Sequence, residues 1–243
     1  MIVNTFEIKA NEFKYPSKEE RCIAKVDFPN FSNFGFEYKS EFVSILKEGK
    51  TLFETNRSNN LYWWDICLQN KIGKLNNAYI NAITNYNRSI PENTAEFEKN
   101  NYLNKIQFDF YTETLYYFLF SVRDIILQII NVYYKLKMNE YDVCLRKLKK
   151  KKLNGNIISL LVTLVNDLDS ATKIRNAFTH RFPINQADYR TIFTKRDEKE
   201  ILAAGTGKKL TPKEIMSNIN KSLPVLSKFL EQLKKEMNIK HSR

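Results

Sequence analysis

Two histidines occur in this chain of 243 residues, and one of them, His180, ends the hexad Arg175-Asn176-Ala177-Phe178-Thr179-His180. These residue types suit phosphodiester chemistry. A guanidinium is permanently charged and matches phosphate oxygens with a fork of donors, so Arg175 could stabilise a pentacoordinate transition state. An imidazole can pass a proton to or from a ribose oxygen near neutral pH, and the amide of Asn176 can orient either group. RNA brings its own nucleophile, the 2′-hydroxyl, so this chemistry needs neither a metal nor a cofactor.

The spacing of the hexad decides which of its side chains can act together. Asn176 and His180 are four residues apart, so a regular helix projects both from one face, with Arg175 and Thr179 on the adjacent ridge. Arg175 and His180 are five residues apart, which is about 140° around a helix. They can converge on one ligand if the last turn loosens, which Pro183 favours, or if a second copy of the helix supplies the complementary group.

Two long antiparallel helices are expected to position the hexad. The first covers about residues 107–137 and is apolar almost all round its middle, so it should be buried among neighbours. The second begins near Asn156 and should end close to Phe182, because Pro183 disfavours helical geometry at the residue before it. Residues 141–153 form a basic turn between them, which either grips RNA phosphates or is simply solvated. The expected RNA contacts are Arg146, Lys147, Lys149, Lys150, Lys151, Lys152 and, after the hexad, Arg181.

The remaining elements are also mostly helical. Residues 40–83 indicate several helices, one of them starting after Asn59 and Asn60. A last helix should start at the cap Thr211, with Glu214 completing a capping box, and Pro224 should kink it or break it in two. Residues 22–28 and 34–38 partly alternate and suggest short strands. We therefore expect an all-α helical bundle with a short extended or hairpin segment at the N-terminus.

Composition limits the classes of partner. The net charge of +12 and the pI near 9.4 favour an anionic partner, nucleic acid first, although Lys- and Asn-rich chains can be basic for compositional reasons alone. The three cysteines are far apart, which argues against disulfides and thiolate metal sites. No signal peptide is visible, and Arg123, Asp124 and Gln128 interrupt the most apolar stretch, which argues against a membrane span. These features predict a cytoplasmic protein without a membrane partner.

Three further groups of residues have alternative interpretations. Glu113 and Asp124 could orient the catalytic groups, or simply take part in structural ion pairs. The aromatic run at residues 62–64, Tyr-Trp-Trp, could stack on bases, or belong to the core. The glycines at 205 and 207 do not make a phosphate loop, because that motif needs glycine where Leu202 stands and Ser or Thr where Lys209 stands.

The hexad, late in a long helix of a basic and helical chain, resembles the Arg-x4-6-His signature of the HEPN superfamily. This resemblance implies a helical bundle that dimerises so that two motifs line one cleft, and a metal-independent endoribonuclease. It also implies that Arg175 and His180 are catalytic and that Asn176 supports them, with Thr179 beside them. A tyrosine two residues after the histidine, which one toxin branch of the family modifies, is absent, because Arg181 and Phe182 follow His180.

The resemblance predicts two parts of the chain, an N-terminal extension at residues 1–100 and a HEPN-like domain at residues 101–243. It implies RNA as the substrate, a homodimer with a composite active site, and a toxin or anti-phage role under an antitoxin or other regulatory protein. The alternative is a HEPN-like module that binds RNA, a nucleotide or a protein without cutting it.

Overall fold

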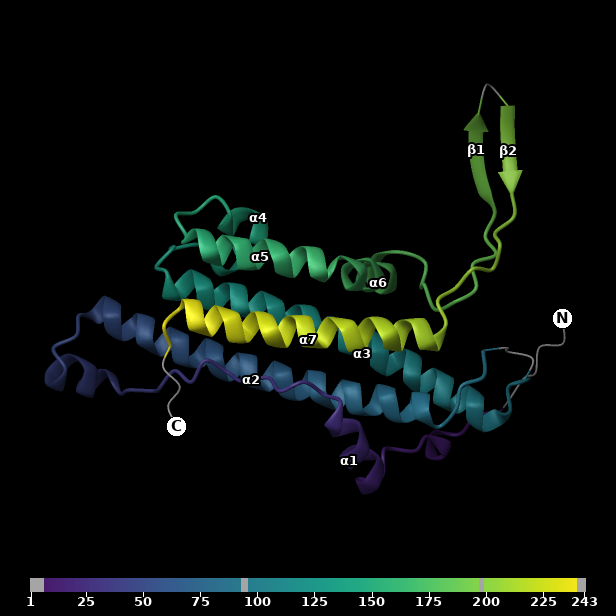
Figure 1. Cartoon of the computed structure of the whole chain (residues 1–243), viewed down its shortest axis with the longest axis horizontal. Coiled ribbons are helices and arrows are strands. Elements are labelled where there is room, and N and C mark those ends of the chain that lie inside the picture. Colours follow the sequence, from purple (N-terminus) through teal and green to yellow (C-terminus); the bar gives the residue numbers. More distant parts are fainter. Residues whose placement is uncertain (1–6, 93–95, 197–198, 240–243) are drawn as a thin grey trace. The chain divides into compact units, whose positions relative to one another are not determined.

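The computed structural model describes residues 7–92, 96–196 and 199–239 (Figure 1). Helices dominate it, as predicted. The long helices are α1 (Lys18–Val26), α2 (Leu52–Asn87), α3 (Lys99–Tyr133), α5 (Gly155–Asp167), α6 (Asp169–His180) and α7 (Pro212–Glu236). Short helical turns are η1 (Ala10–Glu12), η2 (Val43–Lys47), η4 (Glu140–Asp142) and α4 (Leu145–Leu148). Within the described ranges, the strands are β1 (Ile192–Arg196) and β2 (Lys199–Ala203), which pair as an antiparallel hairpin.

The chain forms two compact units, and α2, α3 and α7 each contribute residues to both. Unit 1 contains Met1–Val26, Ala78–Tyr116 and Asp169–Lys221. Unit 2 contains Asp27–Asn77, Tyr117–Leu168 and Ser222–Arg243. The hexad and the β-hairpin therefore belong to unit 1, and the basic turn at residues 141–153 belongs to unit 2.

In unit 1 the end of α2 packs antiparallel against the start of α3. The amide of Asn104 donates to the carbonyl of Arg88 at 3.1 Å, and the rings of Tyr86 and Phe108 lie 6.0 Å apart. The core side chains, all less than 9% exposed, are Ala78, Tyr79, Ile80, Ala82, Ile83, Leu103, Phe108, Leu115, Tyr116, Ala171, Ile174, Ala177, Ile215, Met216 and Ile219. These side chains come from α2, α3, α6 and α7, so α6 is part of the core packing of this unit.

In unit 2 the other halves of α2 and α3 pack together with α4, α5 and the end of α7. Arg57 of α2 donates to the carbonyl of Tyr133 of α3 at 2.7 Å, and the ammonium of Lys71 lies 5.5 Å from the ring of Tyr117. The largest side chains without exposed surface include Leu68, Leu75, Ile126, Ile129, Ile130 and Leu148. The two longest helices, α2 and α3, thus form the antiparallel core pair, whereas the sequence predicted α3 and the helix from Asn156.

Within unit 2, a buried polar cluster attaches residues 27–36 to α2 and α7. The carboxylate of Asp65, 1% exposed, accepts hydrogen bonds from the backbone of Phe34 at 2.8 Å and of Gly35 at 2.7 Å. The ammonium of Lys234, 4% exposed, donates to Ser32 at 2.9 Å. Burial lowers the pKa of Lys234, and the nearby charge of Asp65 opposes that shift. The cluster is a side-chain substitute for the sheet hydrogen bonds that residues 34–38 were expected to make.

The predicted N-terminal strands are wrong. Residues 18–26 form the helix α1, because Ser17 and Glu20 make a capping box: Glu20 donates from its backbone to Ser17 Oγ at 3.2 Å, and Ser17 donates from its backbone to Glu20 Oε2 at 2.7 Å. This cap outweighs the partial alternation of residues 22–28. Residues 34–38 are irregular, with Gly35 in the left-handed region at φ 75°.

Two helix boundaries also differ from prediction. Helix α2 begins at Leu52 rather than after Asn60, because Thr51 and Glu54 form its capping box. The helix expected from Asn156 is divided at Leu168, between two aspartates that favour helix ends over helix interiors. Helix α7 begins at Pro212 as predicted, with Thr211 as its cap. It continues through Pro224, so of the predicted kink or break, the break is wrong.

Helix α3 is long and apolar enough to cross a membrane if judged by length and composition alone. However, 61% of its most apolar stretch is buried within the protein, as in the core helix of a soluble bundle.

Candidate active site

Helix α6 carries the hexad at the edge of unit 1. Ala171, Ile174 and Ala177 are buried, and their spacing of three residues turns one face of the helix to the core. Arg175 and Asn176 are half-buried. Thr179 and His180 are exposed, and His180 is the last residue of the helix. The polar residues of the hexad therefore lie at and beside the surface, while its apolar residues attach it to the core.

The helix stays regular through the motif. The hydroxyl of Thr179 donates to the carbonyl of Arg175 at 3.0 Å, and the backbone of Arg181 donates to the carbonyl of Ala177 at 3.3 Å, one residue past the helix end. The loosened last turn that would bring Arg175 and His180 together is therefore not observed. Within one chain these two residues keep the separation of about 140° that a regular helix imposes.

A chain of hydrogen bonds fixes α6 in this orientation. The hydroxyl of Tyr116 on α3 donates to Asn218 Oδ1 on α7 at 2.7 Å, and Asn218 Nδ2 donates to Ser170 Oγ on α6 at 2.9 Å. The rings of Tyr116 and Phe178 lie 5.9 Å apart, so an apolar residue of the hexad contacts the same tyrosine. Burial raises the pKa of Tyr116, which keeps this hydroxyl a donor across the physiological range. Tyr116 and Asn218 could not be identified from the sequence, because their partners lie more than 40 residues away.

A comparison with protein families identifies the fold. The family description for the Cthe2314-like HEPN domain matches residues 64–243. The chain belongs to this HEPN family. The match begins inside α2, before residue 101 where the helical domain was expected to start, and it includes the whole hexad. No curated protein and no solved structure matches the chain.

In this HEPN domain, contacts of the segment after the hexad hold the base of the β-hairpin. The guanidinium of Arg190 lies 4.3 Å from the ring centre of Phe182 and donates to the carboxylate of Asp188 at 2.7 Å. Arg190 thereby lowers the pKa of Asp188 to about 2. A methyl group on Gly205 would lie 2.5 Å from the carbonyl oxygen of Asp188, so only glycine fits there. The glycines that resemble a phosphate loop are therefore structural.

The two candidate supporting carboxylates of the HEPN domain interact with their own helix neighbours. Asp124, in unit 2, accepts from Arg123 Nη2 at 2.7 Å. Glu113, in unit 1, has a raised pKa, chiefly because of partial desolvation and then because of the charge of Asp109; Lys105 opposes this shift. The ion pair of Asp124 agrees with a structural interpretation of that residue, whereas the neighbours of Glu113 raise its pKa rather than pair with it; the role of both carboxylates toward the hexad stays a prediction.

The predicted RNA contacts of the HEPN domain lie in both units. Arg146 and Lys147 belong to α4, and Lys147 pairs with Asp142 at 2.5 Å, which partly neutralises it. Lys149, Lys150, Lys151 and Lys152 are exposed in the turn that follows. Arg181 is exposed directly after His180 in unit 1. The structure leaves Lys149 to Lys152 and Arg181 accessible to an anionic ligand.

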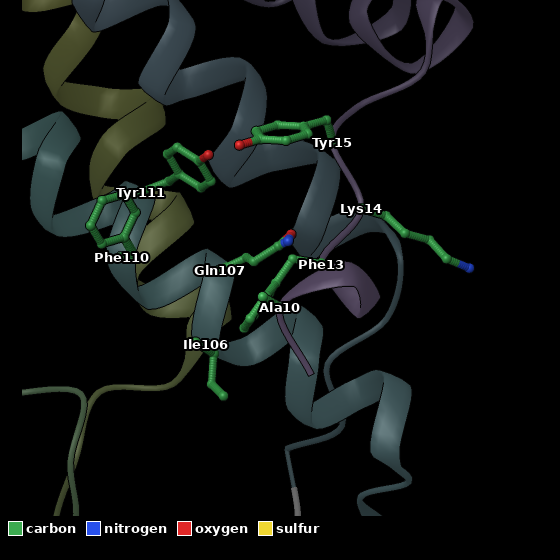
Figure 2. A pocket seen from close by; sticks show the side chains of 8 residues that line it. All are labelled: Ala10, Phe13, Lys14, Tyr15, Ile106, Gln107, Phe110 and Tyr111. Atoms are coloured by element: carbon green, nitrogen blue, oxygen red, sulfur yellow. The ribbon is translucent and has the colours of Figure 1, made fainter. Parts of the chain in front are cut away.

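Unit 1 also has an apolar groove of about 340 Å³ between the N-terminal segment and α3 (Figure 2). It is lined by Ala10, Phe13, Lys14, Tyr15, Ile106, Gln107, Phe110 and Tyr111. Desolvation raises the pKa of Tyr111, and the neighbouring Tyr15 adds to the shift. No residue of the hexad lines this groove, so it offers a surface for contact rather than groups for the chemistry of the motif.

Proposed function

We propose that the chain is a metal-independent HEPN endoribonuclease. The observation that carries this proposal is the position of the hexad in a HEPN domain: Arg175, Asn176 and His180 stand at the end of a helix that the core and a hydrogen-bond chain hold fixed. Rigidly held donors at a surface are what electrostatic stabilisation of a phosphoryl transition state requires.

The proposed reaction uses the substrate's own nucleophile. The 2′-oxygen attacks the adjacent phosphorus, the bond from phosphorus to the 5′-oxygen breaks, and the proton lost by the 2′-hydroxyl is matched by one gained by the leaving 5′-oxygen. His180 takes part in this proton transfer, Arg175 binds the phosphate oxygens as their charge increases, and Asn176 orients these groups. The products carry a 2′,3′-cyclic phosphate and a 5′-hydroxyl.

The active site is proposed to form between two copies of the chain. Arg175 and His180 point about 140° apart on a regular helix, so the Arg175 of one copy would act with the His180 of the other. Unit 1 has apolar surface for such a contact: Phe193 and Leu202 pair across the hairpin and are 60% and 70% exposed. An isolated hairpin is marginally stable in water, so contact with a second copy would also stabilise these strands.

The biological setting follows the same proposal. A toxin or anti-phage ribonuclease acts on RNA in the cytoplasm, and an antitoxin or another regulatory protein keeps it inactive. The net charge of +12 favours RNA among anionic partners.

The second candidate function is a HEPN module that binds RNA, a nucleotide or a protein without cleaving RNA. The observation in its favour is the same divergence of Arg175 and His180 within one chain, since a monomer could not focus both on one phosphate. Such a module would bind RNA equally well with and without His180.

Incubation of end-labelled RNA with the protein in excess EDTA tests the proposed chemistry. We expect cleavage with cyclic phosphate ends, and a loss of about 10²–10⁴-fold in His180→Ala, since that is the usual contribution of general acid–base catalysis. Arg175→Lys should also lose activity, because an ammonium lacks the bidentate fork. His180→Gln is the matched control for helix-end structure. Cleavage that depends on metal, 3′-hydroxyl ends, or full activity in His180→Ala would each contradict the proposal.

A further inference from the structure

A second group of cations and aromatic rings lies in unit 2, apart from the residues of the hexad. It surrounds a pocket of about 210 Å³ between α2, the end of α3 and the loop that follows. The lining residues that carry the argument are Arg57, Asn60, Trp64, Lys135 and Lys137. Glu140 is the one acidic residue among the lining side chains, so the pocket has an excess of positive charge.

The aromatic rings that line the pocket are those of Trp64, from the run at residues 62–64, and of Phe53. Trp63 is 57% exposed and Trp64 is half-buried and lines the pocket, so neither is a core residue. Phe53, 49% exposed, is a further lining residue, and the ammonium of Lys135 lies 5.8 Å from its ring centre. Exposed rings beside cations are the combination with which proteins bind single-stranded nucleic acid.

The two lysines occupy backbone positions that favour glycine. Lys135 has φ 54° and Lys137 has φ 53°, both in the left-handed region. Lys135 ends α3 in a Schellman motif: its backbone donates to the carbonyl of Val132 at 3.2 Å, and that of Leu136 donates to the carbonyl of Asn131 at 3.0 Å. Glycine is the usual residue at this position, because a β-carbon is strained there. A lysine at such a position carries a backbone cost that glycine would avoid.

The loop that carries the lysines is held in place. The side chain of Asn131 donates to the carbonyl of Met138 at 3.0 Å and accepts from the backbone of Met138 at 3.1 Å, which closes the loop around both lysines. Arg57 donates to the carbonyl of Tyr133 at 2.7 Å, so its guanidinium is fixed at the other side. The backbone that carries the lysines and the guanidinium of Arg57 are therefore in place before any ligand binds, which lowers the entropy that binding would cost.

We propose that this pocket binds one nucleotide of a single-stranded RNA, with the base against Trp64 and the phosphate on Lys135 and Lys137. The amides of Asn56 and Asn60 line the same pocket and can hydrogen-bond the edge of a base. The volume is below the roughly 300–1,000 Å³ of small-molecule sites, so the pocket suits part of a strand rather than a whole free ligand. The choice of RNA as the ligand rests on the proposed ribonuclease function, whereas the binding needs no cleavage.

Replacing Lys135 with glycine tests whether its ammonium binds the nucleotide, because glycine suits the backbone at this position. Binding of a fluorescein-labelled oligouridylate is measured in a His180→Ala background, so that cleavage does not interfere. Lys135→Gly should raise the midpoint of thermal unfolding by about 2 °C, since it relieves the strain, and should weaken binding several-fold. The matched control is Asn238→Gly, because Asn238 ends α7 in the same motif at φ 51°, and it should raise the midpoint without changing binding. Equal binding by Lys135→Gly and its parent would overturn the inference.

Charge and stacking are measured separately. Lys137→Gln should lower the slope of log affinity against log salt by about 0.7, the value for one phosphate of a single strand, while the exposed Lys228→Gln should leave it unchanged. The chain has two tryptophans, so in Trp63→Phe the emission reports Trp64 alone, and oligouridylate should quench it. Trp64→Leu should bind about tenfold more weakly.

The outcomes separate the two proposals. One outcome is that RNA quenches Trp64 and binds weakly to Lys135→Gly, while the wild type cleaves no RNA. This result would reject the ribonuclease and leave the pocket assignment standing. Cleavage together with no quenching of Trp64 by bound RNA would reject the pocket and leave the ribonuclease standing. No binding of oligouridylate by the His180→Ala protein would reject the pocket whatever the cleavage assay gives.

Discussion

The hexad combines apolar residues that pack against the core with polar residues that lie at or near the surface. Ala177 and Phe178 attach the end of α6 to the core, while Asn176 and Arg175 are half-buried and His180 is exposed. At the end of a helix a histidine can also interact favourably with the dipole, which is a structural role for His180. The variants of Arg175 distinguish these roles, because a helix-end interaction of His180 does not depend on the guanidinium.

Glu113 allows a prediction about pH at the scale of one residue. Its pKa is raised in the folded protein, so between its ordinary value and the raised one the folded state binds more protons than the unfolded state. The free energy of unfolding therefore falls as pH rises through that window. It stays lower at neutral pH, where Glu113 is charged. Glu113→Gln should raise the free energy of unfolding at pH 7 by less than about 1 kcal/mol, because solvent screens an exposed group.

Denaturant unfolding of Glu113→Gln and wild type at pH 7 and at pH 4 checks this prediction. The difference should shrink as the pH falls toward the ordinary pKa of a glutamate. A Glu113→Gln variant that is less stable than wild type at pH 7 would mean that the charged carboxylate has a favourable partner. Loss of RNA cleavage in the same variant would instead support the role of Glu113 beside the hexad.

Among the helices and strands, the starts and ends that depend on neighbouring residues could be predicted from the sequence. The contacts between residues far apart in the chain could not. Thr211 with Glu214 predicted the start of α7, and Pro183 predicted the end of α6, because both act through neighbours in the chain. The starts of α1 and α2 depend on capping boxes of the same kind and could have been predicted from Ser17 and Thr51. The hairpin was missed although Ile192, Phe193 and Thr194 favour strands.

The parts that could not be predicted depend on contacts between residues far apart in the chain. Asp65 accepts from Phe34, 31 residues earlier, and Lys234 donates to Ser32, 202 residues away. Nothing in the sequence near Asp65 indicates those partners. The same holds for the candidate site: the hexad was readable as a motif, but its attachment through Tyr116 and Asn218 required the fold.

Asp65 provides the prediction at this scale. Asp65→Ala leaves backbone donors of residues 34–36 and the nearby Lys234 without their buried carboxylate, so we expect a loss of about 3 kcal/mol in the free energy of unfolding. Residues 27–36 should also become sensitive to proteases. Asp142→Ala, which removes an exposed ion pair with Lys147, is the control and should cost less than about 1 kcal/mol. An equally small effect of Asp65→Ala would show that the cluster does not hold this segment.

In the whole molecule, the proposed active site needs a second copy of the chain. Helical geometry separates Arg175 from His180 within one protomer, and the regular end of α6 keeps that separation. The exposed hairpin and apolar groove of unit 1 are surfaces that a second copy could cover. The active site is therefore proposed to belong to the dimer, and each protomer holds half of it.

Mixing two inactive variants tests whether the active site is shared between two copies of the chain. Arg175→Ala and His180→Ala proteins are combined in equal amounts, allowed to exchange subunits, and assayed for RNA cleavage beside each variant alone. If the site is composite, each mixed dimer has one site with an intact Arg175 and an intact His180, and random exchange should restore about a quarter of the wild-type rate. If the mixture cleaves no faster than the separate variants while mixed dimers are present, the two residues act within one chain or not in catalysis, and a composite active site is contradicted.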